Sequence, residues 1–257
     1  MTSVEPGAPA VDAPVLPAPV PPTPAPRTLT VVPVTGLGEI GKGDDLAALI
    51  AGVVDLLDGD VVVVTQKIVS KAEGRMVPID PDDPADRLRI IESESVRVLR
   101  RRGDLVISET RHGFVCANAG VDLSNVERGW AALLPEDSDR SARRIRDGLR
   151  AGTGREVAVV VSDTFGRPWR KGVVDVAIGC AGLAAVVDLR GTEDAMGRDL
   201  VATEVCVADE VASAAELVMG KASSVPVAIV RGVDPAWLRR GSVADEILRP
   251  PAEDLFR

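Results

Sequence analysis

Runs of β-branched residues alternate with stretches of helical periodicity along most of the chain. Two continuous apolar runs, at 61–65 and 157–161, predict strands that are buried on both faces. Shorter runs predict further strands at 29–34, 105–108, 114–117, 183–189 and 225–230. Helical periodicity and capping residues predict helices at 44–57 (capped by Asp44), 87–102 (with a basic end), 138–151 and 210–219. The pattern therefore predicts a mixed α/β (α+β) fold, without the regular order of a doubly wound sheet.

A glycine-rich turn, Gly36–Gly43, separates the first predicted strand from the first predicted helix. It matches the G-x-x-x-x-G-K part of a phosphate-binding P-loop, but Gly43 stands where that loop needs a Ser or Thr to ligate Mg²⁺. The overlapping G-x-G-x-x-G spacing is that of a dinucleotide-binding turn, yet the next acidic stretch is a turn and does not end a strand. A structural turn is favoured over both motifs, and another nucleotide contact by this backbone stays open.

The two ends of the chain differ in composition from the rest. Residues 1–27 hold nine of the nineteen prolines and predict a disordered Pro/Ala-rich tail, which leaves 28–246 as the folded domain and 247–257 as a C-terminal tail or junction. No apolar run is long enough to span a membrane, and the N-terminus lacks the pattern of a secretory signal, so a cytoplasmic location is expected.

The net charge and the numbers of cysteine and histidine residues exclude some classes of partner and of metal site. The net charge of -9 argues against nucleic acid, which normally needs a basic stripe. Three widely spaced cysteines and a single histidine, His112, support neither a disulfide framework nor a zinc site.

Three polar segments carry the candidate chemistry. Residues 66–75 place two lysines and an arginine just past a buried strand, as expected for anion ligands, although an ordinary polar loop is the competing reading. Asp163 and Thr164 follow the second buried strand and offer oxygens to a hard cation, while Arg167 and Arg170 suit phosphate or carboxylate groups. Asp122 adds a carboxylate among amide neighbours in residues 118–125.

Together these segments resemble the coenzyme F420 γ-glutamyl ligase family. The resemblance runs in order from residue 29 to 232 through Val31-Val32-Pro33-Val34, Gly36-Leu37-Gly38-Glu39-Ile40, Asp58-Gly59-Asp60, Val69-Ser70-Lys71-Ala72-Glu73-Gly74-Arg75, Ala117-Asn118-Ala119-Gly120-Val121-Asp122, Ser162-Asp163-Thr164-Phe165-Gly166-Arg167-Pro168-Trp169-Arg170 and Ala214-Ala215-Glu216-Leu217-Val218-Met219-Gly220. It implies the mixed-sheet fold of that family, which is neither a P-loop nor a Rossmann fold, and a homodimer.

The resemblance also implies an activity. Members use GTP and divalent metal to join L-glutamate to a deazaflavin coenzyme precursor through an acyl phosphate, with two Mg²⁺ or Mn²⁺ ions expected and K⁺ as a further candidate. The implied metal ligands are Asp122, Asp163 and Thr164. The implied GTP contacts are Leu37, Gly38, Glu39, Ile40, Gln66, Lys67, Lys71, Asn125, Met219, Gly220, Lys221, Ala222, Ser223, Ser224, Val225 and Pro226. Lys71, Arg167 and Arg170 are the catalytic candidates.

One position departs from the family pattern. Relatives often carry a metal-binding Gln after the Met-Gly pair, whereas this chain has Lys221, and a protonated lysine has no lone pair for a cation. We expect the Lys221 ammonium to meet a nucleotide phosphate or to replace the cation.

Residues 247–256 resemble the junction to a nitroreductase-like domain in two-domain relatives, so the chain is expected to be either a stand-alone ligase or the ligase part of a longer protein. Two other functions stay open: another nucleotide-dependent acid–amine ligase, and a non-catalytic GTP-binding module.

Overall fold

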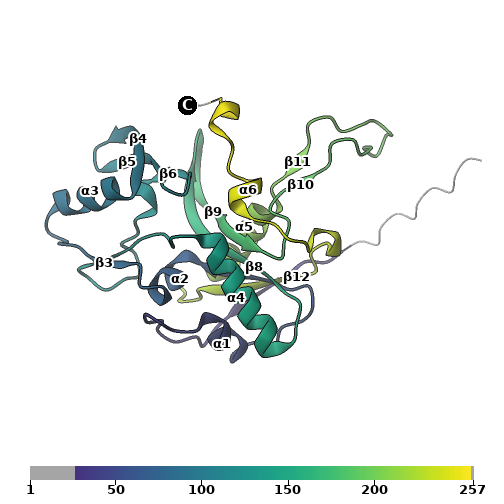
Figure 1. Ribbon diagram of the computed structural model, residues 1–257, viewed down its shortest axis with the longest axis horizontal. Helices are drawn as coiled ribbons and strands as arrows, with labels where there is room; N and C mark the ends of the chain where they lie inside the picture. The colour runs from purple at the N-terminus through teal and green to yellow at the C-terminus, as the bar shows by residue number, and fades with distance from the viewer. Residues whose placement is uncertain (1–26, 256–257) are drawn as a thin grey trace, which may run out of the picture.

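A five-stranded mixed sheet forms the centre of the molecule (Figure 1). The computed structural model describes residues 27–255, so all but the last residue of the tail expected for residues 1–27 lies outside the described residues. The strand order is β1 (Thr30–Val34), β12 (Val227–Arg231), β2 (Val61–Thr65), β8 (Ala158–Arg167) and β9 (Arg170–Ala181). Only β2 and β8 pair in parallel within this sheet, and the other neighbours are antiparallel. The predicted mixed α/β fold, neither P-loop nor Rossmann, is confirmed.

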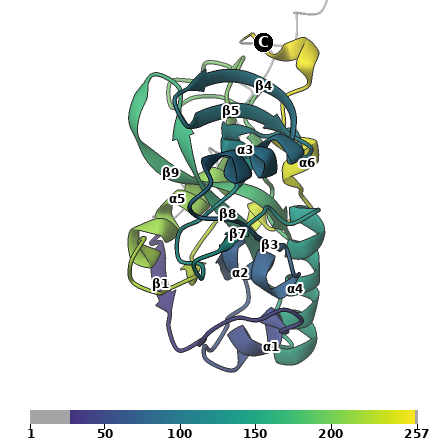
Figure 2. The same ribbon diagram turned by 90° about the vertical axis from the view of Figure 1, so that its left-hand side faces the viewer.

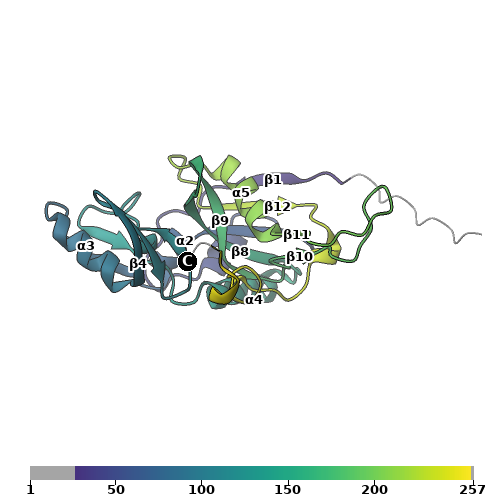
Figure 3. The same ribbon diagram turned by 90° about the horizontal axis from the view of Figure 1, so that it is seen from above.

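Helices cover both faces of this sheet. Helix α4 (Ser138–Thr153) packs on β8 and β9, and α1 (Leu46–Ala51) packs on α4. Helix α5 (Val207–Met219) packs on β9, β12 and β1, and Figure 3 shows α4 and α5 on opposite sides of the sheet. The valines of β2 are fully buried between these layers, as their continuous apolar run predicts.

A smaller lobe extends from one end of the sheet (Figures 1 and 2). It consists of α3 (Pro84–Ser93), the pair β3 (Met76–Pro78) and β7 (Trp130–Ala132), the sheet β4 (Ser95–Arg102), β5 (Leu105–Thr110) and β6 (Val115–Ala117), and the short helix η1 (Asn118–Gly120). This lobe has a core of its own, in which Ile91, Val106 and Leu133 are buried. Helix α2 (Gln66–Ala72) lies between the two parts, following β2 directly.

The predicted helix at 87–102 is wrong. Helix α3 begins earlier, where the Asp83 side chain accepts a hydrogen bond from the Ala85 N–H, and it ends at Ser93. The arginine-rich half is instead strand β4, which pairs with β5. Alternating Val96 and Val98 suit a strand, and pairing with β5 overrides the helical period suggested by the arginines.

Several other boundaries differ from the prediction. Asp45, and not Asp44, caps α1, which ends at Ala51 instead of residue 57. Strand β8 continues to Arg167 and forms a long hairpin with β9, a strand that the sequence pattern did not predict. The predicted strand at 183–189 reduces to β10 (Val187–Asp188), which pairs with β11 (Glu204–Val205). Of the helices described for residues 27–255, none has the length and apolar character of a membrane span.

The remaining short elements follow β12. They are η2 (Pro235–Trp237), α6 (Val243–Glu246) and η3 (Pro251–Glu253). Glu246 of α6 accepts hydrogen bonds from the Ala185 and Val186 N–H groups, which ties this segment to the chain after β9.

Candidate active site

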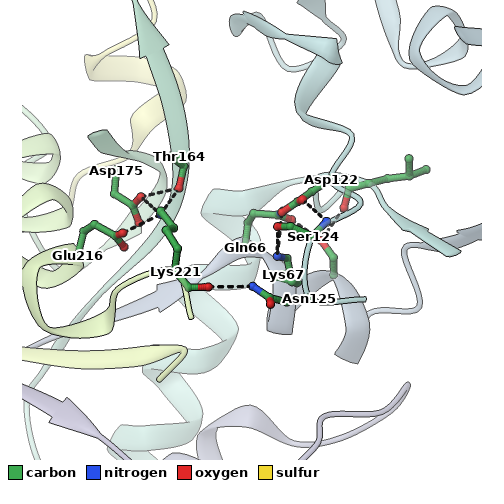
Figure 4. Close-up of polar contacts among 11 residues, drawn as sticks. Gln66, Lys67, Asp122, Ser124, Asn125, Thr164, Asp175, Glu216 and Lys221 are labelled. Atoms are coloured by element: carbon green, nitrogen blue, oxygen red, sulfur yellow. Dashed lines mark hydrogen bonds and ion pairs between the residues drawn. The ribbon is translucent and has the colours of Figure 1, made fainter. Parts of the chain in front are cut away.

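Two groups of polar side chains lie opposite each other where the small lobe meets the central sheet (Figure 4). The acidic cluster comprises Thr164, Asp175, Glu216 and Lys221, from β8, β9, α5 and the loop after α5. The amide–lysine group comprises Gln66, Lys67, Asp122, Ser124 and Asn125, from α2 and the loop after η1. The Asn125 Nδ2 group donates to the Lys221 carbonyl over 3.2 Å and joins the two groups.

Asp175 is the buried centre of the acidic cluster. Its side chain is 2% exposed and accepts hydrogen bonds from the Ser162 hydroxyl at 3.0 Å and the Thr164 hydroxyl at 2.7 Å. These contacts follow from strand pairing, because Thr164 lies directly opposite Asp175 and Ser162 shares the face of Thr164. A buried carboxylate in such a position needs a positive partner.

Lys221 is that partner. Its Nζ lies 2.9 Å from Asp175 and 2.9 Å from Glu216, and it donates a further hydrogen bond to the Thr164 hydroxyl. A lysine ammonium has three donors, so all of them are used within the cluster. Burial opposes its charge, but the bonds to Glu216 and Asp175 outweigh that effect and raise the pKa of Lys221. The ammonium therefore stands where a bound cation would neutralise these carboxylates, and a contact with a phosphate requires the exchange of one of these bonds.

Asp163 interacts electrostatically with both groups, with Asp175 and Lys221 of the acidic cluster and with Asp122. Burial, together with the negative charges of Asp122 and Asp175, raises the pKa of Asp163 to about 7, against the opposing effects of the Thr164 N–H and Lys221. Next to it, the β8–β9 pairing shifts register after Val161, which marks a bulge of the kind that redirects side chains near functional sites. The burial of Asp163 and the negative charges of Asp122 and Asp175 favour the protonated form of its carboxyl group.

Lys67 holds the carboxylate on the opposite side. Its Nζ lies 2.9 Å from Asp122 and 3.0 Å from the Ser124 hydroxyl. Burial raises the pKa of Asp122, but the hydrogen bond from the Ser124 N–H and the Lys67 ammonium outweigh it, so the pKa lies below its ordinary value. Asp122 is therefore an anion at neutral pH.

The amide nitrogen of Gln66 is buried in this region without a hydrogen-bond partner. Gln66 is 2% exposed, and its Oε1 accepts a hydrogen bond from the Ser70 hydroxyl at 2.9 Å, whereas its Nε2 is buried without any partner. A buried amide that gives up its hydrogen bonds to water is costly unless a ligand accepts them.

The glycine-rich turn lies against α2. Leu37 and Ile40 are buried in the main core, while Glu39 is exposed and its carboxylate lies 3.4 Å from the Lys71 ammonium. The Gly43 N–H donates to the Ala72 carbonyl and fixes the turn to the end of α2. The structure therefore brings together two predicted segments that are distant in sequence.

The loop after α5 completes the site. Met219 is fully buried, and Gly220 ends α5 with a positive φ of 59°. The Ser223 hydroxyl donates to the Met219 carbonyl, and the Pro226 carbonyl accepts from the Thr65 N–H beside Gln66. Residues 222–225 thus span the distance between the acidic cluster and the edge of the amide–lysine group.

Arg167 and Arg170 lie apart from these groups. They face each other at the tip of the β8–β9 hairpin, three residues beyond Thr164, which is roughly 10 Å along a strand. The Arg167 Nη2 group donates to the Lys171 carbonyl, and its Nε is buried without a partner. The structure does not bring these arginines into contact with the acidic cluster.

The donor types in the site suit a divalent cation. Carboxylate and hydroxyl oxygens are the ligands that Mg²⁺ and Mn²⁺ prefer, and the pKa of Asp163 is raised by its burial first and then by the charges of Asp122 and Asp175. Within residues 27–255, however, no three acidic, histidine or cysteine side chains are grouped so that they could hold a metal ion. Lys67 and Lys221 neutralise Asp122 and Asp175 instead.

Sequence reasoning missed Asp175 and Glu216. Asp175 lies in none of the motifs described above, and Glu216 lies in the 214–220 motif without a role assigned to it there. Only the pairing of β8 with β9 and the packing of α5 on β9 bring them to Thr164 and Lys221. Burial raises the pKa of Cys116 and Cys180 to about 12. Such thiols are poor nucleophiles at neutral pH.

Comparison with known proteins identifies the family of the chain. Residues 36–232 match the sequence model of the F420-0:Gamma-glutamyl ligase family. The chain is 45% identical to the coenzyme F420:L-glutamate ligase of Methanothermobacter thermautotrophicus over 249 residues, which cover 89% of this chain and 99% of that protein. It is 43% identical to the protein of the same name from Methanopyrus kandleri, covering 90% and 98%, and 39% identical to that of Methanocaldococcus jannaschii, covering 84% and 92%. The chain therefore belongs to the F420-0:gamma-glutamyl ligase family.

Proposed function

We propose that the protein is a GTP-dependent ligase that joins L-glutamate to the glutamate-free precursor of coenzyme F420. The names of the relatives support the substrates. The observation that carries the proposal is the pairing of an acidic cluster with the amide–lysine group across one site, with Asp163 interacting electrostatically with both. Such a site has carboxylate oxygens that can ligate the metal of a metal–nucleotide complex, and lysine and amide groups that can donate hydrogen bonds to phosphate oxygens.

A carboxylate must be activated before an amine attacks it. In the proposed reaction, a carboxylate oxygen of the precursor forms a bond to the γ-phosphorus of GTP, and GDP leaves. The glutamate amine then forms a bond to the acyl carbon, the bond from this carbon to the phosphate oxygen breaks, and the amine proton passes to solvent. Phosphate leaves, and the products are the amide that joins the precursor's carboxyl group to the glutamate nitrogen, GDP and phosphate.

The chain's own residues hold the reactants in this scheme. The ammonium groups of Lys67 and Lys71 attract phosphate oxygens, and the Gln66 amide donates the hydrogen bonds that it lacks in the protein alone. The backbone at 37–40 and 219–226 borders the nucleotide. Arg167 and Arg170 bind an anionic part of the substrates if the hairpin tip moves toward the site.

Asp122, Asp163 and Thr164 hold Mg²⁺ or Mn²⁺ in this proposal, with K⁺ as an accessory ion. The metal neutralises the phosphate charge when bound. The homodimer and the cytoplasmic location expected from the family belong to the same proposal.

Omission of substrates tests the function. Phosphate release from GTP is measured with Mg²⁺, with and without L-glutamate and the precursor, and the product mass is determined. The proposal predicts release that requires both substrates and a product heavier by glutamyl units. GTP binding without a glutamyl product would instead indicate a non-catalytic GTP-binding module, and turnover with a different acid would indicate another acid–amine ligase.

A pair of variants tests the site. Asp163→Asn removes a carboxylate from the site, whereas Asp188→Asn removes an exposed carboxylate that is paired with Arg190 on β10. The first variant should lose turnover while its circular dichroism stays that of the folded protein, and the second should keep turnover. Full activity of Asp163→Asn would contradict the assignment of the metal ligands.

A further inference from the structure

A cavity of about 630 Å³ lies in the small lobe, on the far side of the loop that follows η1. Its walls come from α3, from the β4–β5 hairpin, from this loop and from the beginning of β7. Figure 2 shows α3, β4 and β5 on the side that faces the viewer. The volume lies in the range of small-molecule sites.

The loop of residues 121–126 separates the cavity from the candidate active site. Its Asp122, Ser124 and Asn125 side chains bond to Lys67 and Lys221 within the site. Leu123 and Val126 of the same loop line the cavity. A ligand in the cavity is therefore one loop away from the side chains that we assign to the reaction.

The lining is suited to a flat, largely apolar group. Leu88, Ile91 and Val106 provide an apolar wall that continues into the core of the lobe. Trp130 and Leu123 line the same cavity and are 40% and 39% exposed, so two large apolar side chains are left open to solvent there. Exposed apolar surface inside a concave site is typical of ligand binding, and an indole ring favours stacking with another aromatic ring.

A polar group is also available in the cavity. The Arg87 Nε atom is buried and has no hydrogen-bond partner. Two other arginines of the lining, Arg101 and Arg128, are paired with Glu92 and Asp82. Arg87 can therefore donate to a carbonyl or an anionic oxygen of a ligand without giving up an ion pair seen in residues 27–255.

We propose that this cavity binds the planar aromatic ring system of the carboxylic acid substrate. The inference rests on the proposed function, in which the acid is a deazaflavin derivative. The nucleotide is assigned to the side of the 121–126 loop that carries Lys67, Lys71 and the 219–226 segment, so the cavity on its other side is left for the acid. The ring stacks on Trp130, and the flexible remainder of the acid passes the loop to reach the active site.

The proposal is tested by calorimetry, which measures the binding of the glutamate-free precursor to the wild-type protein and to variants. Trp130→Ala and Leu123→Asp should each weaken precursor binding about tenfold or more, because stacking and apolar burial are lost. Trp130→Phe keeps an aromatic ring and should retain most of the affinity. GTP affinity should change by less than about twofold in Trp130→Ala and Trp130→Phe, since the nucleotide lies on the other side of the loop. Leu123→Asp is compared by precursor binding alone, because it adds a charge next to Asp122.

Two controls make the result specific. Val96→Asp places the same charge on β4 at a side chain that is 67% exposed and does not line the cavity, and it should leave precursor binding unchanged. Thermal unfolding of each variant shows whether it is folded. Precursor binding that is unchanged in folded Trp130→Ala and Leu123→Asp would overturn the proposal. It would also be overturned if these variants bound the precursor normally and Trp169→Ala, which removes an exposed tryptophan outside the cavity, lost binding.

Failure of the inference is distinguishable from failure of the proposed function. If the wild-type protein forms a glutamyl product but the cavity variants bind the precursor normally, only the cavity assignment falls. If the wild-type protein does not bind the precursor, both fall.

Discussion

Replacement of Lys221 by methionine removes the positive charge from the acidic cluster at nearly constant side-chain length. Asp175, which is 2% exposed, then loses a partner at 2.9 Å and keeps only the hydroxyls of Ser162 and Thr164. Glu216 loses its partner at the same distance. The variant therefore leaves a buried carboxylate without a neutralising charge.

The loss in the free energy of unfolding depends on how deeply the two partners are buried. Removal of one member of a fully buried ion pair costs about 3–5 kcal/mol, whereas an exposed pair contributes about 0–1 kcal/mol. The Lys221 side chain is 54% exposed, so water reaches one side of the pair, and we expect a loss of roughly 1–3 kcal/mol. For a chain of this size, such a loss lowers the melting temperature by roughly 2–10 °C.

Thermal and urea unfolding at pH 7.5 in EDTA measure this effect. The raised pKa of Lys221 means that its contribution is fully present below the unfolded-state pKa and is lost only as the pH rises through the folded-state pKa, so it is complete at pH 7.5. Lys171→Met is the matched control, because Lys171 is exposed at the β8–β9 hairpin and should change stability by less than about 0.5 kcal/mol.

Mg²⁺ gives a second readout on the same variants. The cluster without its ammonium should gain affinity for the cation, so Mg²⁺ should raise the melting temperature of Lys221→Met more than that of the wild type. A melting temperature for Lys221→Met equal to that of Lys171→Met, with and without Mg²⁺, would refute the view that Lys221 neutralises Asp175 in the acidic cluster.

Three further predictions concern the packing of α4, the protonation of Asp163 and the role of Gln66. Gly148→Ala should destabilise the protein by about 1–3 kcal/mol in urea unfolding, because its Cβ would lie 2.6 Å from the Ala47 Cβ, whereas Gly152→Ala in the same helix meets nothing within 4 Å and should stabilise it slightly. The pKa of Asp163, about 7, lies above its unfolded value, so the folded state holds an extra proton from about pH 4 to pH 7. Wild-type stability in EDTA should therefore fall by roughly 1–4 kcal/mol as the pH rises through this window, and Asp163→Asn should lack that fall in melting scans. Gln66→Leu removes the unpartnered Nε2, so it should change stability by less than about 1 kcal/mol while GTP affinity, measured by calorimetry, falls about tenfold; equal GTP affinity would contradict its role.

The fold was predictable wherever one physical signal dominated. The runs at 61–65 and 157–161 consist of valine and alanine apart from Thr65, and such runs fit only strands covered on both faces, which β2 and the first half of β8 are. The segment 87–102 failed because its arginines follow a helical period, although Val96 and Val98 belong to a strand pair that forms only with β5. The local sequence pattern holds no information on which distant strand a segment pairs with.

The candidate site was predictable to the extent that its residues lie in motifs. Lys67, Asp122 and Thr164 were identified from the sequence, and the structure places them in two facing groups. Asp175 was not identified, because it becomes a partner of Thr164 only through the register of the β8–β9 hairpin. The contact of Lys221 with carboxylates likewise depends on where α5 ends.

The most direct test of the proposed chemistry follows the oxygen atoms of the acid substrate. The precursor is labelled with ¹⁸O at both oxygens of its reacting carboxylate and incubated with the protein, GTP, Mg²⁺ and L-glutamate, and the product and the released phosphate are analysed by mass. The account predicts a glutamylated product and one ¹⁸O atom in each phosphate, because the phosphate leaves with the oxygen that it took from the carboxylate. Absence of the glutamylated product, or its formation with unlabelled phosphate, would contradict the account.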